Sequence, residues 1–452
     1  MNYRERLLNV IPGGAHTYSR GFDQHPQNVP RILRNGKGVY VYDSEGREFL
    51  DFGMSLRAVN IGYAEESIDS AAIRQIRNGT NLTLPSMIEL EAAELMVELI
   101  DSIDMVKFTK NGSTAVTAAV KLARAYTGRN LVARPSEQPF FSYDDWFIGS
   151  TPITSGIPKD VQSKTLQFHY NDISSLERLI SENPGKIACV VLEPATSECP
   201  SLGSVSNGCC SSKTCLRNYQ NGESNFLQQV EKVCKDNGIV FVLDEMITGF
   251  RWDIQGAQHK YRVTPDLCTF GKAMANGYPL ACVGGKREIM QLGSIEKKGQ
   301  ERVFLLSTTH GAEMVSLGAF IATVEFLKKN DVINNIWHRG AELTSKINAR
   351  AEILGLGSKF IVSGPACSPY FTTKDADNNI SLDYRTLFMQ EMIKNGVLMP
   401  WIALAFRHGP AEINHLEDAI DKSLRVYAKA LDEGVENYLV GPSIQPVFRK
   451  FN

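Results

Sequence analysis

Two residues in this sequence could do chemistry together, Asp244 and Lys272. Asp244 directly follows the apolar run Ile239 to Leu243, and Lys272 comes one glycine after a second run, Leu267 to Phe270. Short uninterrupted apolar runs are typical of strands buried on both faces of a parallel sheet, and such sheets bind ligands beyond the carboxyl ends of their strands. We therefore expect the carboxylate and the amine to lie at the ligand-binding edge of one sheet.

A carboxylate and a lysine at two strand ends are the groups that a pyridoxal phosphate site needs. The lysine amine can bond covalently to the cofactor's aldehyde. The carboxylate can hold the pyridine nitrogen protonated, so that the ring withdraws electrons from a substrate bonded to it. A buried structural ion pair would explain the same two residues equally well, so the pair alone leaves both interpretations open.

The elements around this pair are also indicated by the sequence. The run Ile187 to Leu192 predicts another buried strand, ending in Glu193-Pro194, and a short strand is expected at Lys107 to Thr109. The stretch NGSTAVTAAVKLARAYTG predicts a turn leading into a helix that is closed by Gly128. The first turn of such a helix can bind an anion such as phosphate. An ordinary N-cap formed by Ser113 or Thr114 is the simpler explanation.

Three stretches carry a family resemblance: LDEMITGFRW, TFGK and GYPLACVGG. They resemble class III aminotransferases, with the strongest likeness to the glutamate-1-semialdehyde 2,1-aminomutase branch, and the likeness covers nearly the whole chain. The resemblance implies a fold type I pyridoxal phosphate transferase of the α/β class, with a mostly parallel seven-stranded sheet in the large domain. It also implies an N-terminal segment 1–52, a large domain 53–311 and a C-terminal part 312–452, the two ends forming a smaller α+β domain.

The resemblance further implies roles for individual residues. Lys272 would carry the cofactor and shuttle protons, and Asp244 would pair with the pyridine nitrogen. The remaining cofactor-binding residues would be Gly112 and Ser113 at the phosphate, Phe140 and Met246 on the two ring faces, Glu193 near the ring, and Thr308 reaching the phosphate of a partner in a homodimer. For Glu193 and Thr308 the simpler alternative is a helix cap, and Phe141 is the second choice for the stacking residue.

Arg20, after IPGGAHTYS, and Arg407, in ALAFRHG, are the candidate residues for binding a substrate carboxylate. A surface arginine is the alternative at both positions. Leu404 stands where the aminomutases have a pocket glutamate, and Phe140-Phe141-Ser142 replaces their Tyr-His-Gly. Replacing a charge with an aliphatic side chain changes what a pocket can bind.

We therefore predict an aminotransferase that moves an amino group from an amino acid, glutamate, to an aldehyde or ketone. Asp144 and Asp145 would suit a hydroxylated or sugar-derived acceptor, or could simply be solvated. The aminomutase itself and a catalytically silent relative are the competing predictions. Phe-Phe-Ser retains an aromatic ring for stacking, but it offers no tyrosine hydroxyl or histidine.

Composition bounds the remaining properties. A net charge of −2, with 43% hydrophobic and 22% charged residues, is that of a globular enzyme, and it gives no electrostatic reason to expect binding to nucleic acid or to a membrane. We expect a cytoplasmic protein with reduced thiols. Residues 199–225 are rich in Ser, Gly, Asn and Cys, and we expect a surface loop inserted in the large domain rather than a zinc site, since the cysteines lack paired C-x2-C spacing.

Overall fold

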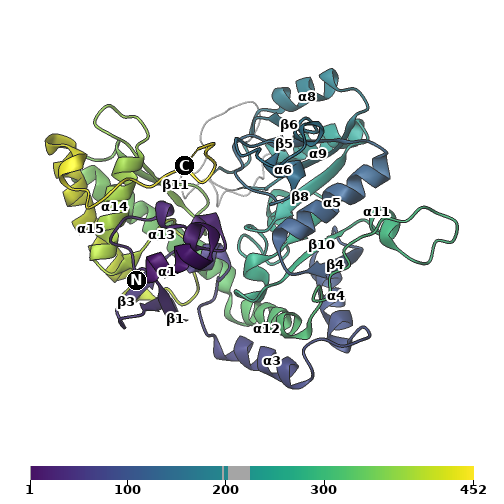
Figure 1. Ribbon diagram of the computed structural model, residues 1–452, viewed down its shortest axis with the longest axis horizontal. Coiled ribbons are helices and arrows are strands. Elements are labelled where there is room, and N and C mark those ends of the chain that lie inside the picture. Colours follow the sequence, from purple (N-terminus) through teal and green to yellow (C-terminus); the bar gives the residue numbers. More distant parts are fainter. Residues whose placement is uncertain (1, 196–197, 202–223, 452) are drawn as a thin grey trace. The chain divides into compact units, whose positions relative to one another are not determined.

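The computed structural model describes residues 2–195, 198–201 and 224–451 (Figure 1). Contacts between residues divide the chain into two compact units. Unit 1 contains the described residues 2–65 and 334–451, and unit 2 contains 66–195, 198–201 and 224–333. In the part of the chain that the structure describes, no helix is long and apolar enough to cross a membrane.

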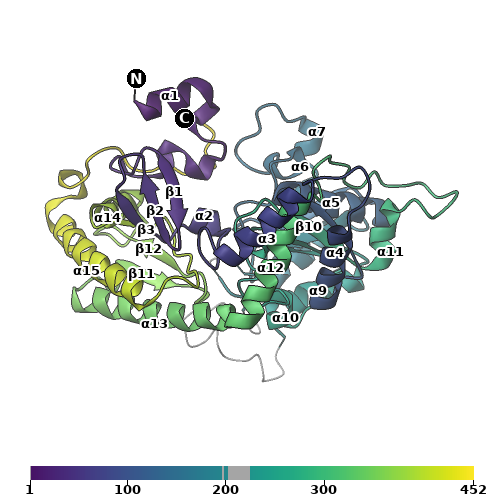
Figure 2. The same cartoon turned by 90° about the horizontal axis from the view of Figure 1, so that it is seen from below.

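The boundaries of these units differ from the predicted boundaries at 52 and 311. Residues 53–65 belong to unit 1, where Glu65 forms a bidentate ion pair with Arg407. The helix α12 (Met314–Asn330) belongs to unit 2, where it lies beside α3 (Glu66–Arg77), as Figures 1 and 2 show. A Cβ on Gly318 of α12 would come within 3.2 Å of the Ala71 carbonyl oxygen of α3, so the two helices pack backbone to backbone.

Unit 2 contains a seven-stranded sheet with the order β4-β10-β9-β8-β7-β5-β6. The strands β9, β8, β7, β5 and β6 are parallel neighbours, whereas β10 is antiparallel to both β4 and β9. This architecture confirms the predicted α/β class with a mostly parallel sheet. The strands are β4 (Met105–Thr109), β5 (Leu131–Pro135), β6 (Thr165–Phe168), β7 (Ile187–Leu192), β8 (Val240–Glu245), β9 (Leu267–Phe270) and β10 (Ala281–Gly285).

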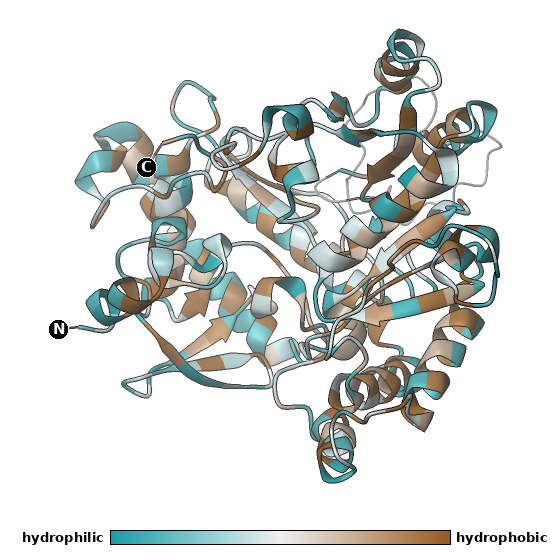
Figure 3. Cartoon of the chain, turned by 45° about the vertical axis from the view of Figure 1, so that its right-hand side comes forward, coloured by the Kyte–Doolittle hydropathy of each residue, from teal (hydrophilic) through white to brown (hydrophobic). Residues whose placement is uncertain are grey.

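In unit 2, α3 and α4 (Met87–Leu99) precede the first strand of the sheet, and the other helices follow strands along the chain. Besides α12, these other helices are α5 (Gly112–Thr127), α6 (Asp145–Ile148), α7 (Lys159–Gln162), α8 (Ile173–Glu182), α9 (Phe226–Asp236), α10 (Ala257–Tyr261) and α11 (Arg287–Met290). Every residue of β7 and β8 is buried, as expected for strands covered on both faces. In Figure 3 the strands of this sheet are mainly brown, whereas many of the surrounding helices are brown in part and teal in part.

Unit 1 is built from both ends of the chain. Its four-stranded sheet has the order β1-β2-β3-β13, in which β13 is parallel to β3 and the other pairs are antiparallel. The strands are β1 (Leu33–Lys37), β2 (Tyr40–Asp43), β3 (Glu48–Asp51), β13 (Val397–Leu398) and the separate pair β11 (Phe360–Ser363) and β12 (Tyr370–Thr373). The helical segments are α1 (Tyr3–Val10), α2 (Met54–Arg57), α13 (Val332–Ile353, which begins at the end of unit 2), α14 (Leu382–Lys394) and α15 (Pro410–Glu433).

Local sequence explains several of these boundaries. The strands β2 and β3 form a hairpin that turns at Ser44–Gly46: Gly46 takes a φ of +83°, and the two strands pair antiparallel. The helix α5 begins after Asn111, whose side chain accepts a hydrogen bond from the Thr114 backbone N–H at 2.9 Å. It ends at Gly128, which has a φ of +68°, as the sequence predicted.

Candidate active site

Asp244 lies in β8 and is 2% exposed. Its Oδ1 accepts hydrogen bonds from the Met246 backbone N–H and from the Thr269 hydroxyl, both at 3.0 Å. Thr269 is its register partner on the adjacent strand β9. Burial raises the pKa of Asp244 to about 6, while the positive charge of Lys272 and the two hydrogen bonds act in the opposite direction. The carboxylate is thus held in place through one oxygen, and Oδ2 is left for a cationic partner.

Lys272 begins the short 3-10 helix η4 (Lys272–Ala275), just beyond β9. Its φ of +45° is in the left-handed region, which a residue with a side chain occupies at a cost in free energy. A Cβ on the preceding residue, Gly271, would lie 2.5 Å from the Met246 sulfur, so a larger residue there would displace the methionine side chain. Strain of this kind at a lysine next to a buried carboxylate is typical of a functional site.

The first turn of α5 supplies the expected anion-binding groups. Because Asn111 is the N-cap, the alternative of a cap formed by Ser113 or Thr114 is wrong. The first N–H groups of a helix have no partner within the helix, so those of Gly112 and Ser113 are placed to bind an anion. The Ser113 hydroxyl oxygen accepts a hydrogen bond from the Tyr143 backbone N–H at 3.1 Å, which leaves its hydrogen free to be donated.

Met246 connects the two halves of this site. Its side chain is 6% exposed and packs with Ala115 of α5 and Ala281 of β10. A Cβ on Gly112 would come within 2.8 Å of its sulfur, as one on Gly271 would within 2.5 Å. The methionine therefore lies between the start of α5 and the residue before Lys272, and the two glycines leave room for its side chain.

The aromatic residues near position 140 separate into core and surface. Phe141 is 2% exposed, whereas Phe140 is 47% exposed and meets Phe147 edge to face at 5.8 Å between ring centroids. Phe140 is therefore accessible to a ligand and Phe141 is not, which favours Phe140 as the stacking residue. The segment is fixed beside α5, because Ser142 donates to the Ser113 carbonyl at 3.2 Å.

Two polar residues that support the site were not identified from the sequence, Gln138 and Thr269. Gln138 donates to the Glu193 carbonyl and accepts from the Glu193 N–H, both at 2.8 Å, so it fixes the backbone of Glu193 directly after β7. Both Gln138 and Glu193 are buried. The signal for Thr269 was present in the sequence, since it is the polar residue of the apolar strand that precedes Lys272.

Thr308 lies in the extended segment before α12 and is exposed. The simpler alternative, that Thr308 caps a helix, is wrong, because the N-cap of α12 is Glu313, whose carboxylate accepts from the N–H groups of Val315 and Ser316. The role of Thr308 at a partner's phosphate remains a prediction that its exposure permits.

The two residues predicted to contact substrate, Arg20 and Arg407, lie in unit 1, as does Leu404, at the position of the aminomutase glutamate. Arg20 is exposed and donates to the Ser55 hydroxyl at 3.3 Å. Arg407 forms the bidentate ion pair with Glu65, both bonds being 3.0 Å, so it binds a substrate carboxylate only if that pair opens. Leu404 is fully buried and packs so close to α13 that a Cβ on Gly340 would lie 2.8 Å from its Cδ1.

Unit 1 also contains a feature that the sequence did not reveal. The four residues of α2, Met54 to Arg57, all have φ between +41° and +66°, so α2 is a turn of left-handed helix. Such a turn costs roughly 1–2 kcal/mol per residue that has a side chain. The Trp401 indole, which donates to the Gly53 carbonyl at 3.0 Å, and the Asp51 carboxylate, which accepts from the Gly53 N–H at 2.7 Å, support it.

The remaining expectations concern acidic and cysteine side chains. Asp144 is the N-cap residue of α6 and Asp145 begins that helix, so both have a place in local structure as well as partial exposure. Of the cysteines weighed as zinc ligands, Cys199 is buried, and the other three, Cys209, Cys210 and Cys215, lie outside the described residues, as does most of the loop at 199–225. Among the described side chains, no three His, Cys, Asp or Glu residues are grouped to hold a metal ion.

The residues of unit 2 fit pyridoxal phosphate. Oδ2 of Asp244 is available to a protonated ring nitrogen, and the helix start at Gly112 is available to a phosphate. Both lie beside Met246, whose sulfur also lies next to Gly271, the residue before Lys272. When bound, the cofactor would supply an electron-withdrawing ring next to the substrate amine. The chain itself supplies the groups that hold the ring and move protons.

Comparisons with known proteins identify the family of this chain. The family model described as "Aminotransferase class-III" matches residues 22–204 and 219–397. The chain belongs to the class III aminotransferase family. Pyridoxal phosphate is the cofactor of this family, so the predicted cofactor and enzyme class, a class III transaminase, are confirmed.

Individual relatives of this class III chain are similar over nearly its full length. The 3-aminobutyryl-CoA aminotransferase of Cloacimonas acidaminovorans is 30% identical, and the match covers 95% of this chain and 98% of the relative. The glutamate-1-semialdehyde 2,1-aminomutase of Archaeoglobus fulgidus is also 30% identical, over 92% and 97%. A solved transaminase with PLP bound is 22% identical, covers 96% and 97%, and has a TM-score of 0.80, which supports the fold.

Proposed function

We propose that this class III enzyme transfers an amino group from glutamate, as the amino acid donor, to a separate aldehyde or ketone acceptor. The observation that carries the choice over an aminomutase lies in unit 1. The position that is a pocket glutamate in aminomutases is Leu404, which is buried against Gly340. A pocket without that carboxylate lacks the group that distinguishes the aminomutase branch. The named relatives include an aminotransferase and an aminomutase, so they support the chemistry and do not choose between the two.

In this proposal, residues of the chain transfer the proton and hold the cofactor. Lys272 takes a proton from the substrate carbon as general base and delivers it to the C4′ carbon of the cofactor as general acid. Asp244, ionised above a pKa of about 6, keeps the ring nitrogen protonated. Gly112 and Ser113 bind the phosphate, Phe140 and Met246 cover the ring faces, and Glu193 lies close to the ring.

The assembly and the acceptor are also part of the proposal. The active unit is a homodimer in which Thr308 of one chain reaches the phosphate bound by the other. Arg20 binds the substrate carboxylate, and Arg407 does so when it leaves Glu65. A hydroxylated or sugar-derived acceptor is supported by Asp145, whose side chain is exposed, although its place at the start of α6 explains it as well. A cytoplasmic location and a lack of nucleic-acid and membrane partners remain predictions.

The test is an absorbance spectrum followed by single amino donors without acceptor. A lysine-linked cofactor absorbs at about 410–430 nm, and transfer of the amino group to it shifts the band to roughly 330 nm. We expect glutamate to cause this shift. Formation of product from glutamate 1-semialdehyde with no added donor would instead establish the aminomutase. A purified protein that gains no band when cofactor is supplied would indicate the catalytically silent relative.

A further inference from the structure

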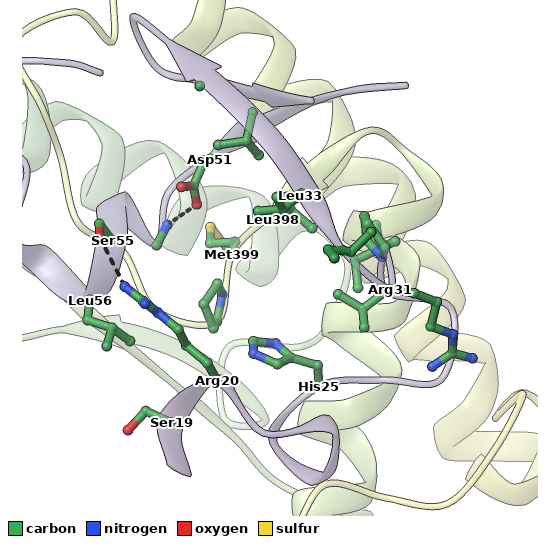
Figure 4. Close-up of a pocket in the computed structure, with 18 of the residues that line it drawn as sticks. Ser19, Arg20, His25, Arg31, Leu33, Asp51, Ser55, Leu56, Leu398 and Met399 are labelled. Carbon is green, nitrogen blue, oxygen red and sulfur yellow. Dashed lines mark hydrogen bonds between the residues drawn. The ribbon is translucent and has the colours of Figure 1, made fainter. Parts of the chain in front are cut away.

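Unit 1 contains a cavity of about 510 Å³, which is within the size range of small-molecule sites. It lies between the segment that carries Arg20 and His25, the sheet strands β1 to β3, the helix α14 and the segment 398–401 (Figure 4). Most of its lining is apolar. The apolar lining residues are Phe22, Val29, Pro30, Ile32, Leu33, Val41, Leu56, Met389, Ile393, Leu398, Met399, Pro400 and Trp401.

This cavity is formed by well-packed residues of unit 1. Val41 and Ile393 are buried and belong to one core cluster, against which Val29 and Leu398 pack. Met389 and Met399 are also buried. The cavity is open to solvent, since Leu33 in its lining is 46% exposed. A ligand that places apolar atoms against this lining would remove apolar surface from water, which favours binding.

The charged groups of the cavity are unevenly distributed. In Figure 4 the Arg20 guanidinium points toward Ser55 and the His25 ring points inward, whereas Leu33, Leu398 and Met399 lie together on the opposite side. Among the described lining residues, the one carboxylate is that of Asp51. It is 7% exposed and accepts from the Tyr63 hydroxyl at 2.6 Å and the Gly53 N–H at 2.7 Å. Arg31 and Arg34 line the cavity as well as Arg20, so its charged lining is mainly cationic, while Leu33, Leu398 and Met399 give it an apolar side.

The wall next to Arg20 is held in a strained form. Ser55 and Leu56, which line the cavity, belong to the left-handed turn and have φ values of +49° and +61°. Glycine would adopt this backbone without strain, yet the chain has side chains at both positions. Strain that is retained in a cavity wall indicates that the placement of those side chains matters for a ligand.

We propose that this cavity binds a substrate that carries a carboxylate and an apolar chain, with the carboxylate at Arg20 and the chain among Leu33, Leu398 and Met399. The proposal rests on the proposed function, because it takes Arg20 as the substrate arginine. It adds the substrate class: an aliphatic carboxylic acid bearing the amine or carbonyl, rather than a short dicarboxylate such as glutamate alone.

The test uses straight-chain alkanoates, which have the carboxylate and the chain but no reacting group. Butyrate, hexanoate and octanoate are titrated into the cofactor-loaded enzyme, and binding is measured by calorimetry. Burial of each methylene should tighten the dissociation constant roughly fourfold, so octanoate should bind about 100-fold or more tighter than butyrate. Arg20→Gln should weaken octanoate at least tenfold, since it removes a charged hydrogen-bond donor.

A variant that fills the cavity with a larger side chain tests whether its apolar lining binds the alkyl chain. Leu33 is 46% exposed, so Leu33→Trp should fold, narrow the cavity and remove most of the advantage of octanoate over butyrate. Ile353→Trp is the matched control, because Ile353 is 73% exposed and does not line the cavity. Equal affinity for butyrate and octanoate, or octanoate binding that Leu33→Trp leaves unchanged, would overturn the proposal. These titrations contain no amino donor, so their failure would leave the absorbance shift with glutamate intact, and the reverse also holds.

Discussion

Replacing Asp244 with asparagine is the most informative perturbation of the site. The amide oxygen of Asn can still accept from the Met246 N–H and the Thr269 hydroxyl, so the geometry at Oδ1 should persist. The negative charge opposite the cofactor's ring nitrogen is lost. We therefore expect turnover to fall far more than cofactor binding.

The magnitude follows from the charge that is removed. Two unit charges about 4 Å apart in a medium of effective dielectric about 20 interact by about 4 kcal/mol. Each 1.36 kcal/mol corresponds to a factor of ten in rate, so Asp244→Asn should lower kcat by about 10³. Thr269→Val removes one hydrogen bond to the same carboxylate, which is worth about 1.5–3 kcal/mol, and should lower kcat by roughly 10- to 100-fold.

The assay is the single-turnover absorbance change with glutamate, compared among wild type, Asp244→Asn and Glu245→Gln. Glu245 is the control because it is the next residue of β8, is equally buried, and accepts from the N–H groups of Ala257 and Gln258 at the start of α10. Glu245→Gln should reduce the free energy of unfolding and leave the single-turnover rate within about tenfold, since its charge is not at the ring. A wild-type rate in Asp244→Asn would refute the assignment.

The raised pKa of Asp244 predicts that both the free energy of unfolding and the cofactor affinity depend on pH. Burial raises the pKa of this carboxyl to about 6, so in the cofactor-free protein its stabilising protonated form is lost as the pH rises through 6. The free energy of unfolding of the cofactor-free protein should therefore fall by up to about 3 kcal/mol between pH 4 and pH 7. Cofactor affinity should rise over the interval between pH 5 and pH 7, because the ring cation pairs with the ionised form. Asp244→Asn should lack both trends in urea titrations and equilibrium dialysis, and their persistence would show that another group titrates.

Lys272→Ala should abolish turnover and the 410–430 nm band (about the position expected for a lysine-linked cofactor) together, and a spectrum with the band retained would contradict its role. Gly112→Ala should weaken cofactor binding, because the new Cβ would lie 2.8 Å from the Met246 sulfur, and Met246→Ala in the same chain should restore part of the affinity in dialysis. Phe140→Ala should raise the cofactor dissociation constant up to roughly tenfold by loss of stacking. Phe141→Ala should instead lower the free energy of unfolding by about 3–5 kcal/mol in urea, and the opposite pattern would exchange the two assignments.

The sequence was most informative where local pattern and position coincide. The apolar runs at Leu267–Phe270 and Ile187–Leu192 became β9 and β7 with those bounds, because a strand buried on both faces leaves no alternative to an uninterrupted apolar run. The same pattern placed Asp244 and Lys272 at the ends of adjacent strands. The helix after Gly112 was predicted with its end at Gly128, since glycine readily adopts the left-handed backbone there.

The sequence was less informative where contacts between residues remote in sequence determine the local structure. Asn111, rather than Ser113 or Thr114, caps α5, because any of these polar residues suits a cap and tertiary context selects one. The left-handed turn at Met54–Arg57 contradicts local propensity, and it is supported by Trp401, which is remote in sequence. The two contact-based units change over near residues 65 and 333 rather than at 52 and 311, because α12 packs on α3.

The discontinuity of unit 1 has a consequence for how the chain is made. Leu50 and Asp51 of β3 pair with Val397 and Leu398 of β13, so this sheet is incomplete until nearly the whole chain has been synthesised. Unit 2 can collapse while the N-terminal segment is still without its partner strand, since domains generally fold as units during synthesis. During that interval the edge of β3 is unpaired and therefore prone to wrong pairing. Truncation near the C-terminus should thus be seen first as aggregation through residues 33–51, before any loss of the large sheet.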